Sequence, residues 1–159
     1  MGKTDSPGKR ETILVVEDRP EIQILLRNVL ELEGYEVEAT DDGYEALDWI
    51  LAGKAVDLIL LDLLMPVMPG REFLELLGRM TGSRKIPVVV VTGLANPGEE
   101  WPLPPAVVAV VQKPCSPRDL VRFVEKALQQ RAGLAAGAAP RFRSLPNGCL
   151  DAAIETAIG

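Results

Sequence analysis

Three acidic side chains stand directly after two short apolar runs. Glu17 and Asp18 follow the run TILVV, and Asp62 follows the run LILL. Short apolar runs bounded by turn residues are typical of strands buried on both faces of a parallel sheet. Because the carboxyl ends of neighbouring parallel strands meet at one edge of the sheet, we expect these three carboxylates to lie close together.

Crowded carboxylates repel one another and raise one another's pKa unless a cation neutralises them. Mg²⁺ is the economical candidate, since it is a hard cation with oxygen ligands. Two alternatives need no metal: Asp62 can initiate a turn, and Asp18 can cap a helix that has Pro20 in its first turn. Neither alternative accounts for all three acids, so the sequence predicts a Mg²⁺ site.

The chain alternates apolar runs with stretches whose apolar residues recur at helical spacing. The expected strands are 12–16, 36–40, 58–61, 88–91 and 107–111. The expected helices carry the apolar sets of 22–30, 46–51, 73–80 and 120–128, the last with Ser116 as its N-cap. Strands that alternate with helices in this way indicate an α/β fold with a doubly wound parallel sheet.

Two further polar residues follow later strands. Thr92 comes directly after VVVV, and Lys113 comes shortly after VVAVV. Taken alone, Thr92 is a β-branched strand residue and Lys113 a surface base. Their place at the carboxyl ends of two more parallel strands favours a role beside the three acids.

With these residues in place, the chain resembles the receiver domains of two-component response regulators. The resemblance covers 11–131 and implies a flavodoxin-like sheet of five strands with helices on both faces. It rests on motifs in the family's order and spacing: Glu17-Asp18, Asp62 with Met65-Pro66 and Gly70, Thr92-Gly93, and Lys113-Pro114.

The resemblance implies a role for each of these polar residues. Asp62 would accept a phosphoryl group from a sensor histidine kinase or a histidine phosphotransfer protein, and Thr92 and Lys113 would contact the phosphoryl oxygens. Lys113-Pro114 would be a cis peptide. The implied protein ligands of Mg²⁺ are the carboxylates of Asp18 and Asp62, that of Glu17 through water, and the backbone carbonyl of Leu64.

Two departures from the family concern the output surface. Val110 stands where the family usually has an aromatic residue that rotates on phosphorylation, so that part of the switch is missing. Prolines at 97, 102, 104 and 105 disfavour the family's fourth helix, because each removes a donor and restricts its predecessor. We therefore expect a proline-rich loop, 97–105, or at most one helical turn.

Two apolar residues, Leu64 and Leu94, occupy variable places beside the site. In the family these places influence how readily water hydrolyses the acyl phosphate. Neither leucine can orient a water, so we expect slow self-dephosphorylation. Beyond its own phosphorylation and dephosphorylation, the chain is expected to have no separate enzymatic activity.

Composition limits the partners. The net charge of −6 disfavours direct nucleic-acid binding. The chain contains no histidine, so it cannot itself be a phosphohistidine donor. Two widely spaced cysteines, Cys115 and Cys149, suggest no disulfide framework. No apolar run is long enough to span a bilayer, and we expect a cytoplasmic protein without a membrane partner.

The two ends differ from the centre. Residues 1–10 are expected to be a flexible lead-in, and 132–159 a tail without room for a second domain. The tail begins as a flexible linker, and an apolar stripe at 150–158 suggests a short amphipathic helix. Such a helix could dock on the same domain, a second copy or a partner, while a frayed tail is the alternative.

Two classes of function remain open. The first is a single-domain response regulator, phosphorylated on Asp62, that signals through contact with a downstream protein. The second is a receiver-like interaction or dimerisation module that acts independently of phosphorylation. A flavodoxin-like flavin protein lacks support, because no phosphate-cradling loop follows the first strand. A haloacid-dehalogenase-like phosphatase is disfavoured as well, because that family has a second aspartate two residues after the first, where this chain has Leu64.

Overall fold

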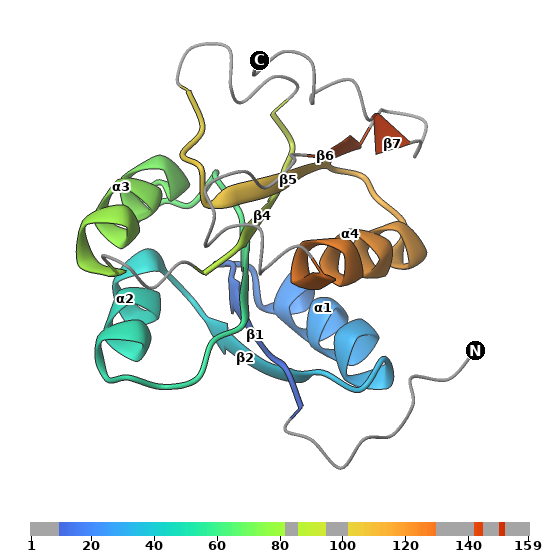
Figure 1. Ribbon diagram of the computed structural model, residues 1–159, viewed down its shortest axis with the longest axis horizontal. Coiled ribbons are helices and arrows are strands. Elements are labelled where there is room, and N and C mark those ends of the chain that lie inside the picture. Colours follow the sequence, from blue (N-terminus) through green and yellow to red (C-terminus); the bar gives the residue numbers. More distant parts are fainter. Residues whose placement is uncertain (1–9, 82–85, 95–101, 130–141, 145–149, 152–159) are drawn as a thin grey trace.

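A twisted sheet lies between two layers of helices in the computed structural model, which describes residues 10–81, 86–94, 102–129, 142–144 and 150–151 (Figure 1). The strands are β1 (Thr12–Val16), β2 (Glu36–Thr40), β3 (Leu58–Leu61), β4 (Val88–Thr92), β5 (Val107–Gln112), β6 (Phe142–Ser144) and β7 (Leu150–Asp151). The helices are α1 (Pro20–Leu32), α2 (Gly43–Leu51), α3 (Gly70–Thr81) and α4 (Pro117–Gln129).

The first five strands are all parallel, in the order β2-β1-β3-β4-β5. Every residue of β1, β3 and β4 is buried, which is what the uninterrupted apolar runs predicted. The outer strand β2 instead contains both buried and more exposed residues. The predicted five-stranded, doubly wound sheet of the flavodoxin-like class is therefore confirmed.

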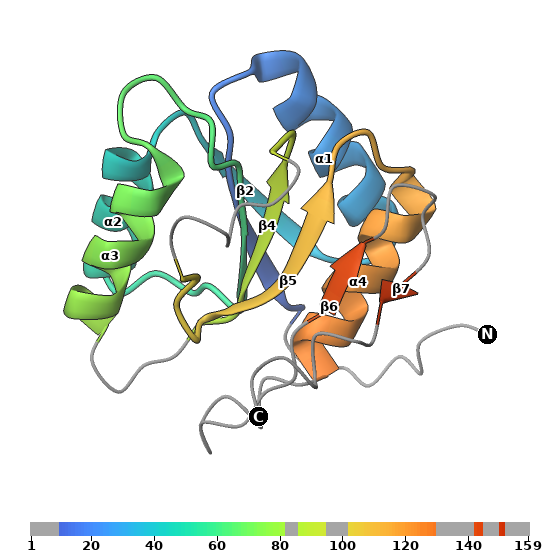
Figure 2. The same ribbon diagram turned by 90° about the horizontal axis from the view of Figure 1, so that it is seen from above.

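The sheet separates two hydrophobic cores. Helices α1 and α4 cover one face, and α2 and α3 cover the other (Figure 2). Successive residues of a strand point to opposite faces, so Ile13 and Val15 pack with the first pair of helices and Leu14 and Val16 with the second. Helix–strand alternation along the chain thus gives a three-layer molecule.

No helix is found between β4 and β5 in the part of this connection that the structure describes. Pro102, Leu103 and Pro104 have no regular structure, and a turn at 105–106 leads into β5. Residues 95–101 lie outside the described ranges. The proline-rich loop expected at 97–105 therefore agrees with the structure over its described residues.

The sheet continues past the predicted fifth strand. Strand β6 pairs in parallel with β5, and β7 pairs in antiparallel with β6. Of the short amphipathic helix expected at 150–158, the first two residues, Leu150–Asp151, form β7 instead, and the rest lies outside the described residues. Residues 152–159, the lead-in 1–9 and the linker 130–141 lie outside the described residues.

Two helix starts position the site. Helix α1 begins with Pro20 at its first turn, after Arg19, which caps it without a side-chain hydrogen bond. Helix α4 begins at Pro117, and its first turn is capped as expected, because the Ser116 hydroxyl accepts a hydrogen bond from the Asp119 amide at 3.1 Å. Both connections leave the carboxyl end of a strand, where the polar residues stand.

Candidate functional site

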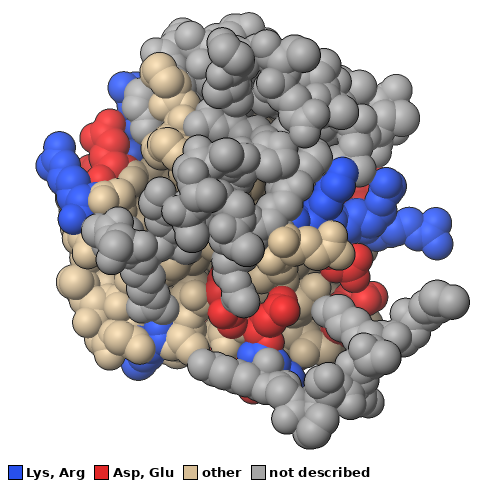
Figure 3. Space-filling model, viewed as in Figure 1, with Lys and Arg blue, Asp and Glu red and all other residues tan. Residues whose placement is uncertain are grey.

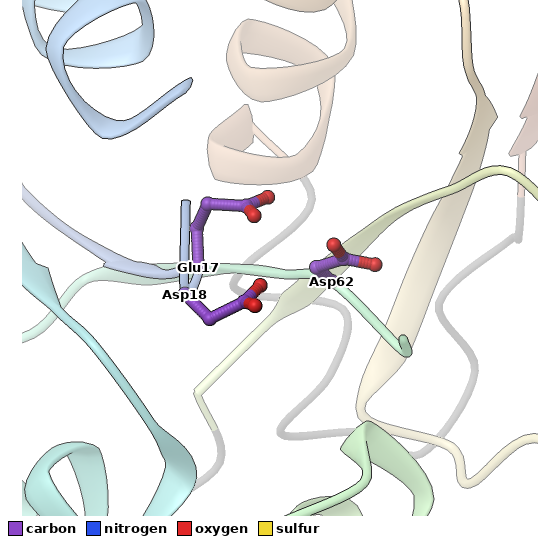
Figure 4. Close-up of side chains that lie close together, drawn as sticks. All are labelled: Glu17, Asp18 and Asp62. Carbon is purple, nitrogen blue, oxygen red and sulfur yellow. The ribbon is translucent and has the colours of Figure 1, made fainter. Parts of the chain in front are cut away.

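The three predicted acids meet at the carboxyl edge of the sheet. Strand pairing places them there, since the Asp62 amide donates to the Val16 carbonyl at 3.1 Å. One carboxylate oxygen from each of Glu17, Asp18 and Asp62 lies within 4.8 Å of the others. Figure 4 shows the three side chains close together at the ends of β1 and β3, with the carboxylates of Glu17 and Asp18 directed toward the side on which Asp62 lies. Glu17 and Asp62 are only 3% and 6% exposed.

Asp18 has an unusual environment for an acid. Its Oδ1 is buried and has no hydrogen-bond partner among the residues that the structure describes. Helix α1 is capped by Arg19 and not by this side chain, so the capping alternative for Asp18 is wrong. A buried carboxylate oxygen without a donor is unfavourable unless a cation completes its surroundings. The three-carboxylate donor set and this free oxygen fit a hard divalent cation such as Mg²⁺.

Lys113 lies across from the acids. Its Nζ is 3.3 Å from Asp62 Oδ2 and 3.4 Å from Glu17 Oε2. A cis peptide joins Lys113 to Pro114, as the resemblance implied. Burial raises the pKa of Glu17, while the positive charge of Lys113 lowers it and the negative charge of Asp62 raises it again. The ammonium therefore offsets part of the repulsion between the two carboxylates.

Thr92 ends β4 and is fully buried. Its hydroxyl accepts a hydrogen bond from the Leu94 amide at 3.2 Å, and its carbonyl accepts one from the Lys113 amide at 2.8 Å. On β3, Asp62 Oδ1 accepts a hydrogen bond from the Leu64 amide at 3.0 Å. The ends of three adjacent strands thus present Asp62, Thr92 and Lys113 at the same edge.

Sequence reasoning missed Gln23, a half-buried residue of α1. Its Nε2 lies 2.6 Å from the Glu17 carbonyl, 2.8 Å from Asp41 Oδ1 and 3.3 Å from the Thr40 carbonyl. The amide thereby ties α1 to the ends of β1 and β2. No sequence signal marks this role, because it depends on β2 lying beside β1.

A cavity of about 420 Å³ opens beside the acids, between α1 and the connection from β5 to α4. Glu17, Asp62 and Lys113 line its polar end. The rest of the wall is mainly apolar and includes Ile22, Leu25, Val29, Pro114, Cys115 and Leu120. Sequence patterns did not indicate this cavity, since its walls come from distant segments.

The outer rim of the site is apolar as well. Leu64, Val67 and Leu94 are 57%, 62% and 41% exposed. The first two lie in the connection from β3 to α3, and the third follows β4. The acidic centre is therefore flanked by side chains that neither donate nor accept hydrogen bonds.

Comparison with known proteins places the chain in a family. The model of the response regulator receiver domain matches residues 13–125, and the chain belongs to this family. The polar-differentiation response regulator DivK of Brucella anthropi is 34% identical over 116 residues, which are 72% of this chain and 91% of DivK. The predicted family membership is confirmed.

A longer relative and a solved structure are also similar to this chain. The cyclic di-GMP phosphodiesterase response regulator RpfG of Xanthomonas campestris is 36% identical over 122 residues, covering 75% of this chain but only 32% of RpfG. The response regulator TrrA of Thermotoga maritima, solved in complex with Mg²⁺-BeF, has 29% identity and a TM-score of 0.63 over 74% of this chain and 98% of TrrA. The chain therefore spans a receiver-sized part of RpfG and nearly all of TrrA.

Proposed function

We propose that this chain accepts a phosphoryl group on Asp62 from the phosphohistidine of a sensor histidine kinase or a histidine phosphotransfer protein, in a Mg²⁺-dependent reaction. The observation that carries the proposal is the convergence of Glu17, Asp18 and Asp62 with Lys113 at the carboxyl edge of the sheet. We propose a single-domain regulator that passes the signal by contact with a downstream protein.

Phosphoryl transfer needs an in-line nucleophile and fixed positive charge around the transferred group. An Asp62 carboxylate oxygen attacks phosphorus, the bond from phosphorus to the donor imidazole nitrogen breaks, and the electron pair stays with the imidazole. Asp18, Asp62 and the Leu64 carbonyl would hold Mg²⁺ directly and Glu17 through water; the ion, when bound, neutralises charge on the phosphoryl oxygens.

Lys113 and Thr92 complete the proposed cradle. Lys113 already touches Asp62, so its ammonium is within reach of a phosphoryl oxygen attached there. Among the described residues, the Thr92 hydroxyl accepts a hydrogen bond from the Leu94 amide and donates none, so its hydrogen can rotate toward an oxygen of the new group. In the phosphorylated protein, the bonds from these two donors to the phosphoryl oxygens would take the place of the interactions that the unmodified Asp62 carboxylate makes.

We propose that the acyl phosphate is lost slowly. Leu64 and Leu94, exposed residues that stand two places after Asp62 and Thr92, are apolar and cannot orient an attacking water molecule. In the same region, the cavity beside α1 and the exposed Ile24 and Leu25 offer apolar contact to the phosphoryl donor.

The charge of the molecule indicates the class of partner. On the face shown in Figure 3, the described basic side chains form small groups with acidic ones between them, and the whole chain carries a net charge of −6. We propose protein partners and not nucleic acid.

No helix among the described residues is long and apolar enough to cross a membrane. We propose a cytoplasmic location, where a kinase would supply the phosphoryl group.

A second candidate is an interaction module that does not use phosphorylation. Val110 is the observation in its favour, because a buried valine on β5 cannot reorient as an aromatic ring would. The phosphodiesterase activity in the name of RpfG is not proposed for this chain, which spans about a third of that protein.

Intact-mass analysis after incubation with acetyl phosphate separates the two candidates. We expect one added phosphate in the wild type with Mg²⁺, and none without Mg²⁺ or in Asp62→Asn. Asp48→Asn, the same chemical change on an exposed part of α2, is the matched control and should still be labelled. An unlabelled wild type, or labelling that survives Asp62→Asn, would overturn the proposal and favour the second candidate.

A further inference from the structure

The side-chain amide of Gln23, in the first turn of α1, faces a set of oxygen atoms. They are the backbone carbonyls of Glu17 and Thr40 and the carboxylate of Asp41. Because carbonyl oxygens only accept hydrogen bonds, the nitrogen end of the amide must point toward them. Glu17 and Thr40 are both buried, so little water is available to replace this donor.

Gln23 also closes a short loop around Asp18. The Gln23 backbone amide donates to the Arg19 carbonyl at 3.1 Å, and the Gln23 side chain reaches back to the Glu17 carbonyl at 2.6 Å. That carbonyl belongs to the planar peptide group that joins Glu17 to Asp18. A hydrogen bond to its oxygen therefore holds the backbone from which the Asp18 side chain projects.

The carboxylate of Asp18 depends on its backbone more than the carboxylate of Glu17 does. The Arg19 amide and the Lys113 ammonium hold the Glu17 carboxylate in place. Asp18 Oδ1, in contrast, accepts no hydrogen bond from the residues that the structure describes. The position of the Asp18 carboxylate in the acidic cluster therefore follows from the position of its main chain.

The amide of Gln23 is itself held from the other side. Asp41 Oδ1 accepts its hydrogen bond at 2.8 Å. Asp41 lies in the turn before α2, where its backbone amide donates to Glu45 Oε2 at 2.9 Å. In the same turn, Asp42 caps α2 by accepting a hydrogen bond from the Glu45 amide at 2.9 Å. The acceptor that orients Gln23 thus belongs to a well-braced turn.

We propose that Gln23 is a positioning residue for the cation site, whose amide holds the Glu17 carbonyl so that the Asp18 carboxylate lies where Mg²⁺ binds. This role rests on the proposed function, because it presupposes the Mg²⁺ site. Mg²⁺ requires near-ideal octahedral geometry, so a small displacement of one ligand weakens binding. Removing a group that orients a metal ligand typically lowers metal affinity by roughly 10- to 100-fold.

Two substitutions of Gln23 separate the donor from side-chain shape and charge. Gln23→Met keeps the length of the side chain but has no donor, and it should raise the Kd for Mg²⁺ roughly tenfold. Gln23→Lys restores a donor and should keep the Kd within roughly threefold of the wild type. The positive charge of lysine by itself weakens cation binding, so tighter binding in Gln23→Lys than in Gln23→Met would come from the donor. Gln129→Met, the same change at an exposed position of α4, is the matched control.

Titration calorimetry with Mg²⁺ measures the Kd, and the Tm in chelator shows whether each variant is folded. The rate of labelling by acetyl phosphate over a series of Mg²⁺ concentrations gives a second readout. In Gln23→Met, the Mg²⁺ concentration for half-maximal rate should rise by the same factor as the Kd. The rate at saturating Mg²⁺ should stay that of the wild type, because Gln23 donates to neither Asp62 nor Lys113. A merely structural defect would lower the maximal rate instead.

Equal Kd values for Mg²⁺ in Gln23→Met and the wild type would overturn the proposal. Equally weak binding in Gln23→Met and Gln23→Lys would overturn it as well, because the shape of the side chain and not its donor would then be responsible. A wild type that binds no Mg²⁺ would overturn the metal site on which the proposed function depends. Normal Mg²⁺ binding and labelling in Gln23→Met would remove the role of Gln23 alone and leave the proposed function intact.

Discussion

Glu17 and Asp18 are adjacent in the chain, yet their carboxylates meet different surroundings. Glu17 lies 3.4 Å from Lys113 and accepts a hydrogen bond from the Arg19 amide at 3.2 Å. Asp18 has a buried carboxylate oxygen that finds no hydrogen-bond partner in the described part of the chain. The protein itself thus offsets the charge of Glu17, whereas the buried oxygen of Asp18 is available to a ligand.

The raised pKa of Glu17 predicts a pH dependence of stability in the absence of Mg²⁺. Burial is the main cause of the raised pKa, so the native state binds a proton more tightly than the unfolded chain does. The free energy of unfolding should therefore fall as the pH rises from the usual value of 4.5 through the raised pKa. Glu17→Gln lacks this component and should gain stability relative to the wild type at neutral pH.

Urea unfolding at a series of pH values, with chelator present, checks this prediction. Glu33→Gln, a change at an exposed position after α1, is the control and should follow the wild type. If the free energies of unfolding of the wild type and Glu17→Gln differ by the same amount at every pH, the burial of Glu17 does not make the stability depend on pH.

At the scale of elements, the connection from β3 to α3 fixes the position of Asp62. The Gly70 amide donates to the Leu63 carbonyl at 3.1 Å, which folds the connection back on itself. A Cβ at Gly70 would lie 2.6 Å from Leu63 Cα and 2.8 Å from the Asp62 carbonyl oxygen. These are backbone atoms, so a methyl group there must displace the end of β3.

Gly70→Ala should therefore lower both stability and the rate of phosphorylation of Asp62. We expect a loss of about 1–3 kcal/mol in the free energy of unfolding, the range for backbone clashes at buried sites. Gly78→Ala on the same helix is the matched control, because nothing lies within 4 Å of its Cβ. The control should gain up to about 1 kcal/mol from helix propensity. Equal stability of the two variants would contradict the clash.

The strands that carry the site were predictable because their signal is local. The apolar runs end at or close to the polar residues of the site, as LILL does at Asp62, and parallel pairing brings those ends together. Gln23 was not predictable, because its three acceptors belong to the ends of two strands and the start of a turn. The cavity was missed for the same reason.

Strand β7 shows how a helical and a strand periodicity can compete. The apolar residues from Leu150 onward fit a helical stripe, and that stripe suggested a helix at 150–158. Over two residues, periods of 2 and 3.6 cannot be told apart, and pairing with β6 decided the outcome.

At the scale of the whole molecule, Mg²⁺ should stabilise the fold because it binds the native carboxylate cluster and not the unfolded chain. Free Mg²⁺ at one hundred times its dissociation constant would add about 2.7 kcal/mol to the free energy of unfolding. In the absence of Mg²⁺, Asp18→Asn should be more stable than the wild type, since the amide removes the unpaired buried charge. When Mg²⁺ is added, the variant should show little of the increase in stability that the wild type shows.

Calorimetric Tm values, measured with Mg²⁺ and with chelator, check this prediction. Asp48→Asn on α2 should keep the full shift, because Asp48 is exposed and is not one of the clustered acids. A Mg²⁺ shift in Asp18→Asn equal to that of the wild type would place the ion elsewhere.

The sheet keeps the two hydrophobic cores apart, and this has a consequence for how the sequence can change. Phe73 belongs to the core under α2 and α3, and Phe123 to the core under α1 and α4. Side chains that share no neighbours contribute independently to stability, so substitutions in the two cores should add. One face of the protein can therefore be remodelled over evolutionary time for new partners, while the other keeps its packing and the strand ends between them keep the chemistry.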